Sequence, residues 1–315
     1  MPSWPSCPEL RRSLRRWLFA GLLALWLAPA CAESPTLTVH VTVDWEGWSL
    51  EEENLDAMRD FRKRFPHIPL LQLMNPVYFI RPGADARQIQ AKIERTLLPS
   101  DTIGLHLHAW KTLVLHCRLP YRSQPSFAAV DESCEGKECG YTVSLELAYS
   151  NTELRQLLAC GSQILTDQGF PQPRHFRAGG WQQGPKLAAA LARQGFSYDS
   201  SRISADLLAP RWGADSAMVR LVRALHPDAG PLDQPYPLAP GLTEYPNNGG
   251  LADYTPTETL LDLFRQVLAA RKPVLVLGFH QETAFDFLDR LAAAIPRMEE
   301  EARAAGVTLR WADYR

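Results

Sequence analysis

Two kinds of hydrophobic pattern alternate along this chain of 315 residues. Short continuous apolar runs, such as residues 37–43 and 274–279, predict buried strands, whereas apolar residues three or four positions apart, as in residues 50–65, predict helices. The other predicted strands are residues 70–73, 102–108, 175–177, 198–200, 242–246 and 307–311. The other predicted helices are residues 86–98, 154–168, 185–194, 257–270 and 285–305. Residues 207–242 contain several prolines and fit neither pattern.

Polar residues and glycines mark the ends of several predicted helices. Ser49 and Glu52 have the spacing of a capping box, in which each side chain binds a free backbone N–H of the first turn. Residues 150–153, which read Ser-Asn-Thr-Glu, predict the start of the helix at residues 154–168. Gly169 and Gly195 follow the last turns of two helices, where a left-handed backbone is common.

Strands that alternate with helices are typical of a parallel β/α architecture. No stretch with the composition of a linker divides the chain, so we expect one domain over residues 33–315. A distorted β/α barrel of about seven strands fits best, and an open doubly wound sheet is the alternative. No Gly-x-Gly-x-x-Gly follows the first strand and no Walker loop occurs, which disfavours a nucleotide-binding fold.

The overall charge argues against a polyanionic partner. The formal net charge is −2, so nucleic acid is not an expected partner. Hydrophobic residues make up 46% of the chain, enough for a sizeable core in a domain of this length.

The first 32 residues have the pattern of an export signal. Four arginines precede an apolar stretch at residues 17–27, which small residues follow, and the stretch is short for a membrane span. Cleavage after Ala32 is preferred and cleavage after Ala30 is the alternative, while a lipid anchor at Cys31 or a twin-arginine signal at Arg15 is less favoured. We therefore expect a periplasmic or secreted protein without an integral membrane span in the mature chain.

An exported chain changes how its cysteines are interpreted. Four remain after the signal, Cys117, Cys134, Cys139 and Cys160, and an even number in an oxidising compartment favours disulfides. Three of them lie in or beside a polar stretch at about residues 111–145, which we interpret as a loop insertion. Zinc binding is the competing interpretation, but the spacing is loose for it. The sequence does not determine the pairing.

Polar side chains follow several of the predicted strands. Asp44 and Glu46 are two residues apart at the end of the first strand, and His106 and His108 have the same spacing at the end of another. Residues two apart on a strand point to the same side. Two carboxylates can perform acid–base chemistry or bind a metal, and an acid with two histidines is a common ligand set for a catalytic metal. Capping of the next helix is the structural alternative.

Two further clusters complete the candidate site. His280 ends the most hydrophobic strand, where it would serve as a third ligand, a general acid or a helix cap. Arg177 follows another strand, and an arginine among acids orients a carboxylate and lowers its pKa. The aromatic residues beside these clusters suit sugar stacking or core packing equally, and they are Trp45, Trp110, Trp181 and Tyr245.

The order of these motifs resembles the polysaccharide deacetylase family, the NodB-homology carbohydrate esterases. Residues 42–47, Thr-Val-Asp-Trp-Glu-Gly, resemble a variant of the family's opening Thr-Phe-Asp-Asp-Gly, and residues 103–108, Ile-Gly-Leu-His-Leu-His, resemble its histidine motif. Residues 177–181, Arg-Ala-Gly-Gly-Trp, residues 196–201, Phe-Ser-Tyr-Asp-Ser-Ser, and residues 277–280, Leu-Gly-Phe-His, resemble later motifs. The resemblance covers about residues 36–311 and includes the NodB-type distorted barrel.

The resemblance implies a role for each site residue. Asp44 would be the general base, Glu46, His106 and His108 would hold a divalent metal, preferably zinc with cobalt or nickel as alternatives, and His280 would protonate the leaving group. By the same resemblance, Arg177 would fix Asp44, and a backbone N–H near the insertion after His108 would help hold the oxyanion. Trp181 would wall the acetyl pocket, with Trp110, Trp45 and Tyr245 as further substrate contacts.

Two departures from the family pattern affect the metal site. The family's second histidine follows the first by four residues, where this chain has Trp110, and the second acid of the first motif is Glu46 instead of aspartate. The expected function is an exported, metal-dependent hydrolase that removes N-acetyl, or less favourably O-acetyl, groups from an envelope or secreted polysaccharide. A catalytically degenerate member that binds polysaccharide is the main alternative, and a glycoside hydrolase using Asp44 and Glu46 is a weaker one.

Overall fold

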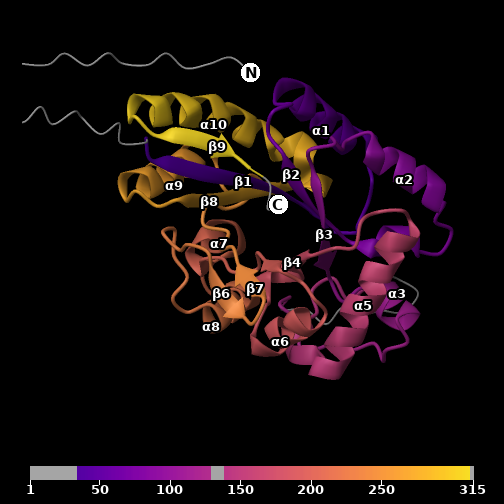
Figure 1. Cartoon of the computed structure of the whole chain (residues 1–315). Coiled ribbons are helices and arrows are strands. Elements are labelled where there is room, and N and C mark those ends of the chain that lie inside the picture. Colours follow the sequence, from indigo (N-terminus) through magenta and orange to yellow (C-terminus); the bar gives the residue numbers. More distant parts are fainter. Residues whose placement is uncertain (1–33, 129–137, 313–315) are drawn as a thin grey trace, which may run out of the picture. The chain divides into compact units, whose positions relative to one another are not determined.

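The computed structural model describes residues 34–128 and 138–312 (Figure 1). Nine strands of these residues form one sheet. Their bounds are β1 Thr36–Trp45, β2 Leu70–Met74, β3 Thr102–Leu107, β4 His175–Ala178, β5 Tyr198–Asp199, β6 Tyr236–Ala239, β7 Leu242–Glu244, β8 Val274–His280 and β9 Thr308–Trp311. Each expected strand is present, and the boundaries agree within a few residues.

The sheet is mostly parallel, as the alternating pattern predicted. Its order is β6-β7-β5-β4-β3-β2-β1-β8, with β9 also paired to β1. The strands from β7 to β8 in this order are parallel, while β6 pairs with β7 in the antiparallel sense. With β9, which also pairs with β1 in the parallel sense, eight strands are parallel, close to the expected number. The prediction of a distorted β/α barrel is confirmed.

The two ends of the curled sheet are joined by an irregular segment in place of a regular strand pair. Residues 249–252 follow β7 and exchange backbone hydrogen bonds with β8, at distances of 2.8–3.1 Å. Just before them, the Asn248 side-chain amide donates to the carbonyl of Val274 and accepts from the N–H of Val276. The Gln234 amide binds both backbone groups of Val274. Side-chain amides therefore complete the edge of β8 where no strand is available.

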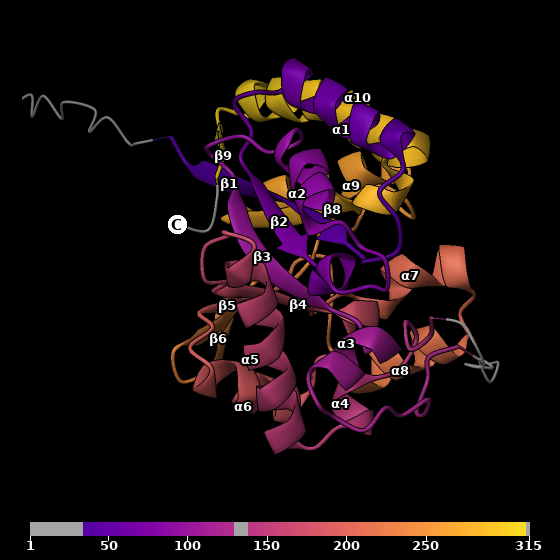
Figure 2. The ribbon, with the colours of Figure 1, turned by 90° about the vertical axis from the view of Figure 1, so that its right-hand side faces the viewer.

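Helices cover the outside of the sheet, and α1 lies beside α10 in both views (Figures 1 and 2). Short 3₁₀ turns span Pro76–Phe79, Gly179–Trp181 and Gln281–Thr283. The α-helices are α1 Glu52–Arg64, α2 Ala86–Glu94, α3 Lys111–His116, α4 Leu145–Ala148, α5 Asn151–Asp167, α6 Pro185–Arg193, α7 Ala205–Trp212, α8 Ala217–Leu225, α9 Thr257–Ala269 and α10 Ala284–Ala304.

The region that the sequence left unassigned contains α7, α8 and β6. The two helices pack on each other and build a small hydrophobic cluster separate from the main core. Leu208, Val219 and Val222 are fully buried in this cluster. Each helix has only about two turns and Pro210 lies inside α7, which explains why the apolar period was too short to recognise.

The capping box predicted at Ser49 and Glu52 is wrong. Helix α1 begins at Glu52 with Glu51 as its N-cap residue, and no side chain caps it. Glu52 and Glu53 in the first turn instead place negative charge at the positive end of the helix dipole. A capping box does form at α5, where Ser150 and Glu153 bind each other's backbone N–H groups.

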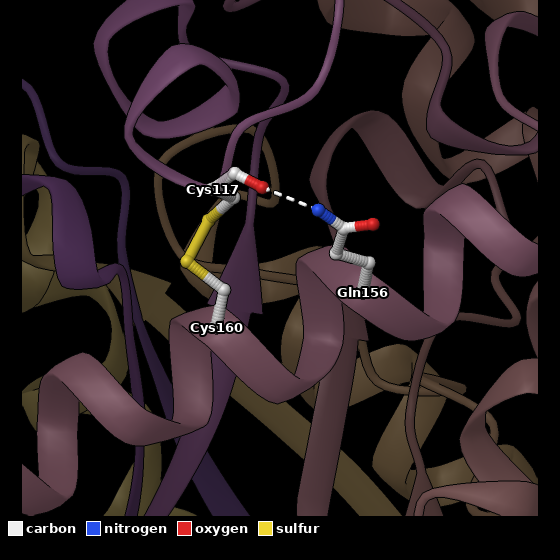
Figure 3. The surroundings of a disulfide bond; sticks show 3 residues. All are labelled: Cys117, Gln156 and Cys160. Carbon is white, nitrogen blue, oxygen red and sulfur yellow. Dashed lines mark hydrogen bonds between the residues drawn. A yellow bond between two sulfur atoms is a disulfide. The ribbon is translucent and has the colours of Figure 1, made fainter.

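A disulfide ties the insertion to the body of the domain (Figure 3). It joins Cys117, at the end of α3, to Cys160 in α5, at a sequence separation of 43 residues. Gln156 strengthens the junction by donating from its side-chain amide to the carbonyl of Cys117, at 2.7 Å. The disulfide interpretation is confirmed for this pair, and zinc binding by these two residues is wrong. Cys134 lies outside the described residues.

The remaining calls on the N-terminus cannot be compared with the fold, since residues 1–32 also lie outside the described part. Within residues 34–128 and 138–312, no helix is both long enough and apolar enough to cross a lipid bilayer.

Candidate active site

The ends of β1, β3, β4 and β8 bring the candidate residues together. Asp44 lies opposite His280 in the pairing of β1 with β8, and His106 lies opposite Arg177 in the pairing of β3 with β4. Because parallel strands end at one rim of a barrel, side chains that follow them converge there. The fold therefore gathers residues that are far apart in the sequence.

Glu46, His106 and His108 form a compact group of three buried side chains. The Glu46 Oε2 atom lies 3.3 Å from His106 Nε2 and 2.5 Å from His108 Nε2. All three ligand atoms lie within 4.8 Å of one another. His108, which follows His106 by two residues, thus lies in one group with His106 and Glu46.

The outer ring nitrogens fix how the two histidines face this group. His106 Nδ1 lies 3.0 Å from the carbonyl of Arg177, and His108 Nδ1 lies 2.5 Å from the carbonyl of Tyr141. A carbonyl only accepts, so each Nδ1 carries the proton and each neutral ring presents a lone pair on Nε2. Backbone carbonyls in this role orient metal-binding histidines.

The three side chains fit a divalent metal. Two imidazole lone pairs and a carboxylate are a set typical of catalytic zinc, with room for a water or substrate. Among the described residues, His108 Nε2 is buried without a hydrogen-bond partner, although Glu46 Oε2 is only 2.5 Å away. A buried carboxylate whose Oε2 faces two imidazole lone pairs favours a bound cation.

Close packing holds His108 in place. The His108 and Tyr141 rings stack, with centroids 4.1 Å apart and planes 11° apart. The His108 ring also lies close to Gly179. A Cβ at this position would lie 2.5 Å from His108 Nδ1, so only glycine fits there. Trp110 holds Glu46 in place, because its Nε1 donates to the carbonyl of Glu46 at 2.8 Å.

Asp44 is held by a buried arginine. Arg177 Nη1 donates to Asp44 Oδ1 at 2.7 Å and to Thr42 Oγ1 at 2.8 Å. The other guanidinium nitrogens donate to the carbonyl and the hydroxyl of Ser200, at 2.7 and 2.8 Å. Because each of these bonds restrains the planar guanidinium, Asp44 Oδ1 is fixed, while Oδ2 lies 4.0 Å from His280 Nε2.

His280 bridges two carboxylates on the other side of Asp44. Its Nδ1 lies 2.8 Å from Asp253 Oδ1, and its Nε2 lies 2.8 Å from Glu46 Oε1 and 4.0 Å from Asp44 Oδ2. Burial lowers the pKa of His280, but Asp253 and Glu46 outweigh burial and raise it well above its usual range. His280 therefore carries a proton that it can donate.

Glu282 supports the loop that carries Glu46. Its carboxylate accepts from the N–H groups of Glu46, at 3.2 Å, and Trp48, at 3.1 Å, and from the hydroxyl of Tyr78. Burial, followed by the charge of Glu46, raises the pKa of Glu282 to about 7. These contacts hold the loop that places Glu46 beside the histidines.

Sequence reasoning missed Asp253, Tyr141 and the role of Glu282. Glu282 belongs to the polar cluster at residues 278–282 and was open to recognition. Asp253 follows an irregular segment, and Tyr141 lies in the insertion, so no periodic pattern marks either residue. Only the tertiary contacts with His280 and His108 reveal them.

A cavity of about 270 Å³ is lined by Glu46 and His280 of the candidate site. Trp181 lines it, as do the exposed rings of Trp48 and Trp212. Trp181 has a left-handed backbone with φ of 62°, which is costly for a bulky residue and is common at functional sites. Its ring lies 4.8 Å from the Arg177 guanidinium carbon.

The other aromatic candidates lie away from the cavity. Trp45 is fully buried, and its Nε1 donates to Gln72 Oε1 at 2.8 Å. Trp110 is buried behind Glu46, as described above. Tyr245 packs with Tyr198, Leu71 and Leu73 in a separate small cluster. Of the four, the structure places only Trp181 on the cavity wall.

No family model matches the chain, and no curated protein matches it. Solved structures do match. A family 4 carbohydrate esterase from Streptomyces lividans, in complex with acetate, is 10% identical, with a TM-score of 0.40, and the match covers 88% of this chain and 92% of the other. A family 4 acetyl xylan esterase from Clostridium thermocellum, in complex with a cobalt ion, is 11% identical, with a TM-score of 0.40, and 86% of each chain is covered.

A third match is a pseudoenzyme of carbohydrate esterase family 4 from Bacillus anthracis. It is 10% identical, with a TM-score of 0.38, and the match covers 88% of this chain and 67% of that one. These three solved structures are family 4 carbohydrate esterases, one of them a pseudoenzyme.

Proposed function

We propose that this protein is a metal-dependent deacetylase that hydrolyses acetyl groups of a polysaccharide, N-acetyl in preference to O-acetyl. The single observation that carries the proposal is the group of Glu46 Oε2 with the Nε2 atoms of His106 and His108. Both Nδ1 atoms face backbone carbonyls, which leaves two lone pairs and a carboxylate turned toward one point. Neither core packing nor helix capping accounts for that arrangement.

Glu46, His106 and His108 would hold the metal, zinc by preference with cobalt or nickel as alternatives. A metal in this position polarises an acyl carbonyl and lowers the pKa of a bound water. Glu282 and Trp110 keep Glu46 in place through its N–H and its carbonyl. Tyr141 and Gly179 keep His108 in place. The residues around the ligands thus pre-form the site.

Asp44 is the general base of the proposed reaction. Arg177 holds Oδ1 and neutralises part of its charge, while Oδ2 takes the proton of the attacking water. Arg177 is itself fixed by Ser200 and Thr42, so the carboxylate cannot turn away. This division gives the two acids of the first strand different tasks, with Asp44 as base and Glu46 as ligand.

His280 is the general acid. Its raised pKa keeps it protonated near neutral pH, and Asp253 holds Nδ1 so that Nε2 points toward the site. The proton on Nε2 passes to the leaving nitrogen, or to the leaving oxygen of an ester, as the tetrahedral adduct collapses. Trp181 forms a wall against the acetyl methyl group.

An exported protein agrees with this substrate. The disulfide between Cys117 and Cys160 is typical of an oxidising compartment, which supports the proposal of a periplasmic or secreted location. A polysaccharide of the envelope or the surroundings is the substrate class available there.

Metal content and acetate release test the proposal together. Protein purified with zinc should hold one ion per chain and release acetate from an acetylated oligosaccharide, and removal of the ion with a chelator should abolish release. His106→Ala should lose both the ion and the activity. The matched control His67→Ala alters an exposed histidine on the loop after α1 and should keep both.

The outcome separates the two candidate functions. Wild-type protein that holds no metal and still binds the oligosaccharide would replace the enzyme with a binding protein on the same fold. Metal binding without acetate release from either N-acetyl or O-acetyl substrates would retain the metal site and refute the reaction.

A further inference from the structure

Part of the cavity wall comes from α7 and α8. Arg211 and Trp212, at the end of α7, line it together with Met218 of α8, and we call these three residues the α7 wall. Arg211 and Trp212 are exposed, whereas Met218 is buried in the small cluster beneath them. The wall thus presents one cation and one aromatic ring to whatever enters the cavity.

Arg211 differs from the other arginines of this hairpin. Arg223 forms an ion pair with Asp206, and Arg220 donates to the carbonyl of Asp215. Within the described part of the chain, no carboxylate or carbonyl pairs with Arg211. An arginine in a ligand cavity without a protein partner can offer its planar donor fork to an oxyanion.

The carboxylates that line the cavity do not neutralise Arg211, because each has another contact. Asp253 binds His280, Glu46 belongs to the metal-ligand group, and Glu282 accepts the N–H groups of Glu46 and Trp48. No ion pair joins any of them to Arg211 in the residues described. The guanidinium charge is therefore left for a ligand.

Two exposed tryptophans border the same cavity from different elements. Trp48, 58% exposed, lies on the loop after β1 and packs against Trp110 and Tyr141, with ring centroids 5.2 and 5.8 Å apart. Trp212, 45% exposed, makes no ring contact with another aromatic residue of the described chain. Flat apolar rings at both borders, each costly to expose to water, fit a ligand with apolar faces and a polar edge, as a sugar ring has.

We propose that the cavity recognises an acidic saccharide, in which Arg211 binds a carboxylate or phosphate on the sugar while Trp48 and Trp212 contact its ring faces. This inference rests on the proposed function for the position of the acetyl group, and it adds the charge of the substrate. The substrate class is then an anionic polysaccharide, although the chain itself carries a formal net charge of −2.

A binding measurement on the metal-loaded full chain tests this. The probes are a uronate oligosaccharide, the same oligosaccharide with its carboxyl groups reduced to alcohols, and a phosphorylated oligosaccharide of equal length. Wild-type protein should bind at least one acidic probe about tenfold more tightly than the reduced probe, by titration calorimetry, and the preference should weaken as salt rises. The uronate and phosphate arms show which oxyanion is preferred.

Two variants decide whether Arg211 is responsible. Arg211→Gln should remove the preference and leave binding of the reduced probe unchanged, while the control Arg220→Gln, one helix away, should keep the preference. Equal binding of all three probes by the wild type would overturn the inference, and so would an undiminished preference in Arg211→Gln.

The binding readout keeps this inference separate from the reaction. A charge preference without acetate release would retain the acidic ligand and refute the proposed deacetylase. Acetate release with equal affinity for the neutral and acidic probes would retain the enzyme and refute the acidic substrate.

Discussion

The two sides of the cavity are built in different ways. One side presents Glu46 and His280, and we call these two residues and their neighbours Asp44, His106 and Arg177 the pocket floor. These residues lie at or just after the ends of sheet strands, and each polar group has fixed partners. The α7 wall stands on a separate hydrophobic cluster, and its two outermost side chains, Arg211 and Trp212, are exposed. Reaction chemistry needs groups fixed within fractions of an ångström, whereas recognition of a polymer surface tolerates adaptable contacts. The difference teaches that the proposed chemistry and the proposed substrate recognition would rest on separate elements of the fold.

The largest effect should come from Asp44, the proposed base on the pocket floor. Asp44→Asn should lower the rate of acetate release about 10²- to 10⁴-fold, because proton abstraction from water is lost while the shape is kept. Zinc content should stay at one ion per chain. Steady-state kinetics and metal analysis check both, with Asp206→Asn, an exposed acid of α7, as the control. Normal turnover in Asp44→Asn would remove Asp44 from the role of base.

The next largest effect should be a difference in stability between a variant of the pocket floor and a variant of the α7 wall. Arg177→Met should lower the free energy of unfolding by about 3–5 kcal/mol, because Asp44 would stay buried without its cation. Arg211→Met should change it by about 0.5 kcal/mol or less, since Arg211 is exposed and has no ion pair within the described residues. Denaturant unfolding of the two variants gives the comparison. Equal losses would mean that the α7 wall is as tightly integrated as the floor.

The stability of the protein should also depend on pH, through a buried pair of carboxyl groups. Asp199 on β5 and Glu244 on β7 are buried neighbours, and Glu244 accepts the N–H of Arg202 just before α7. Burial, followed by the proximity of Asp199, raises the pKa of Glu244 well above its usual range, and burial raises the pKa of Asp199 to about 6. The folded pair therefore keeps protons that the unfolded chain has released.

The sign follows from proton linkage. Because the folded state binds more protons, stability from this pair is fully present below the unfolded pKa values near 4 and is lost as pH rises to about 6 and above. Glu244→Gln should flatten this decline, by roughly 1–2 kcal/mol between pH 4 and pH 7. Thermal unfolding across that range is the measurement, with exposed Glu300→Gln as control. An unchanged slope in Glu244→Gln would contradict the shared-proton interpretation.

The smallest effects should come from substitution of the two exposed tryptophans, Trp48 and Trp212, and these effects should differ. Trp48→Ala removes packing against Trp110 and Tyr141, so it should lower both thermal stability and oligosaccharide affinity. Trp212→Ala should lower only affinity, by about 1 kcal/mol, because no aromatic ring of the described chain packs on it. Calorimetry of binding and of unfolding checks each variant. A loss of stability in Trp212→Ala would show that this ring is part of the fold instead of the binding surface.

The sequence predicted the regular part of the fold. Strands β1 and β8 and helices α5, α9 and α10 follow from long apolar periods with clear ends, which depend on local residues alone. Helices α7 and α8 escaped recognition because each is short and buries its apolar face in a small separate cluster. The false capping box at Ser49 arose because the spacing of two side chains does not by itself specify where a helix begins.

The sequence by itself determined which side chains are available for chemistry. Asp44, Glu46, His106, His108 and His280 were recognisable because polar residues at the ends of apolar strands face the rim of a parallel sheet. Only the tertiary structure decided how they combine. It turned two imidazole lone pairs to one carboxylate, brought Asp253 to His280, and set Arg211 and Trp212 across the cavity. Those contacts join residues far apart in the chain, and their geometry depends on packing and register, which no local pattern encodes.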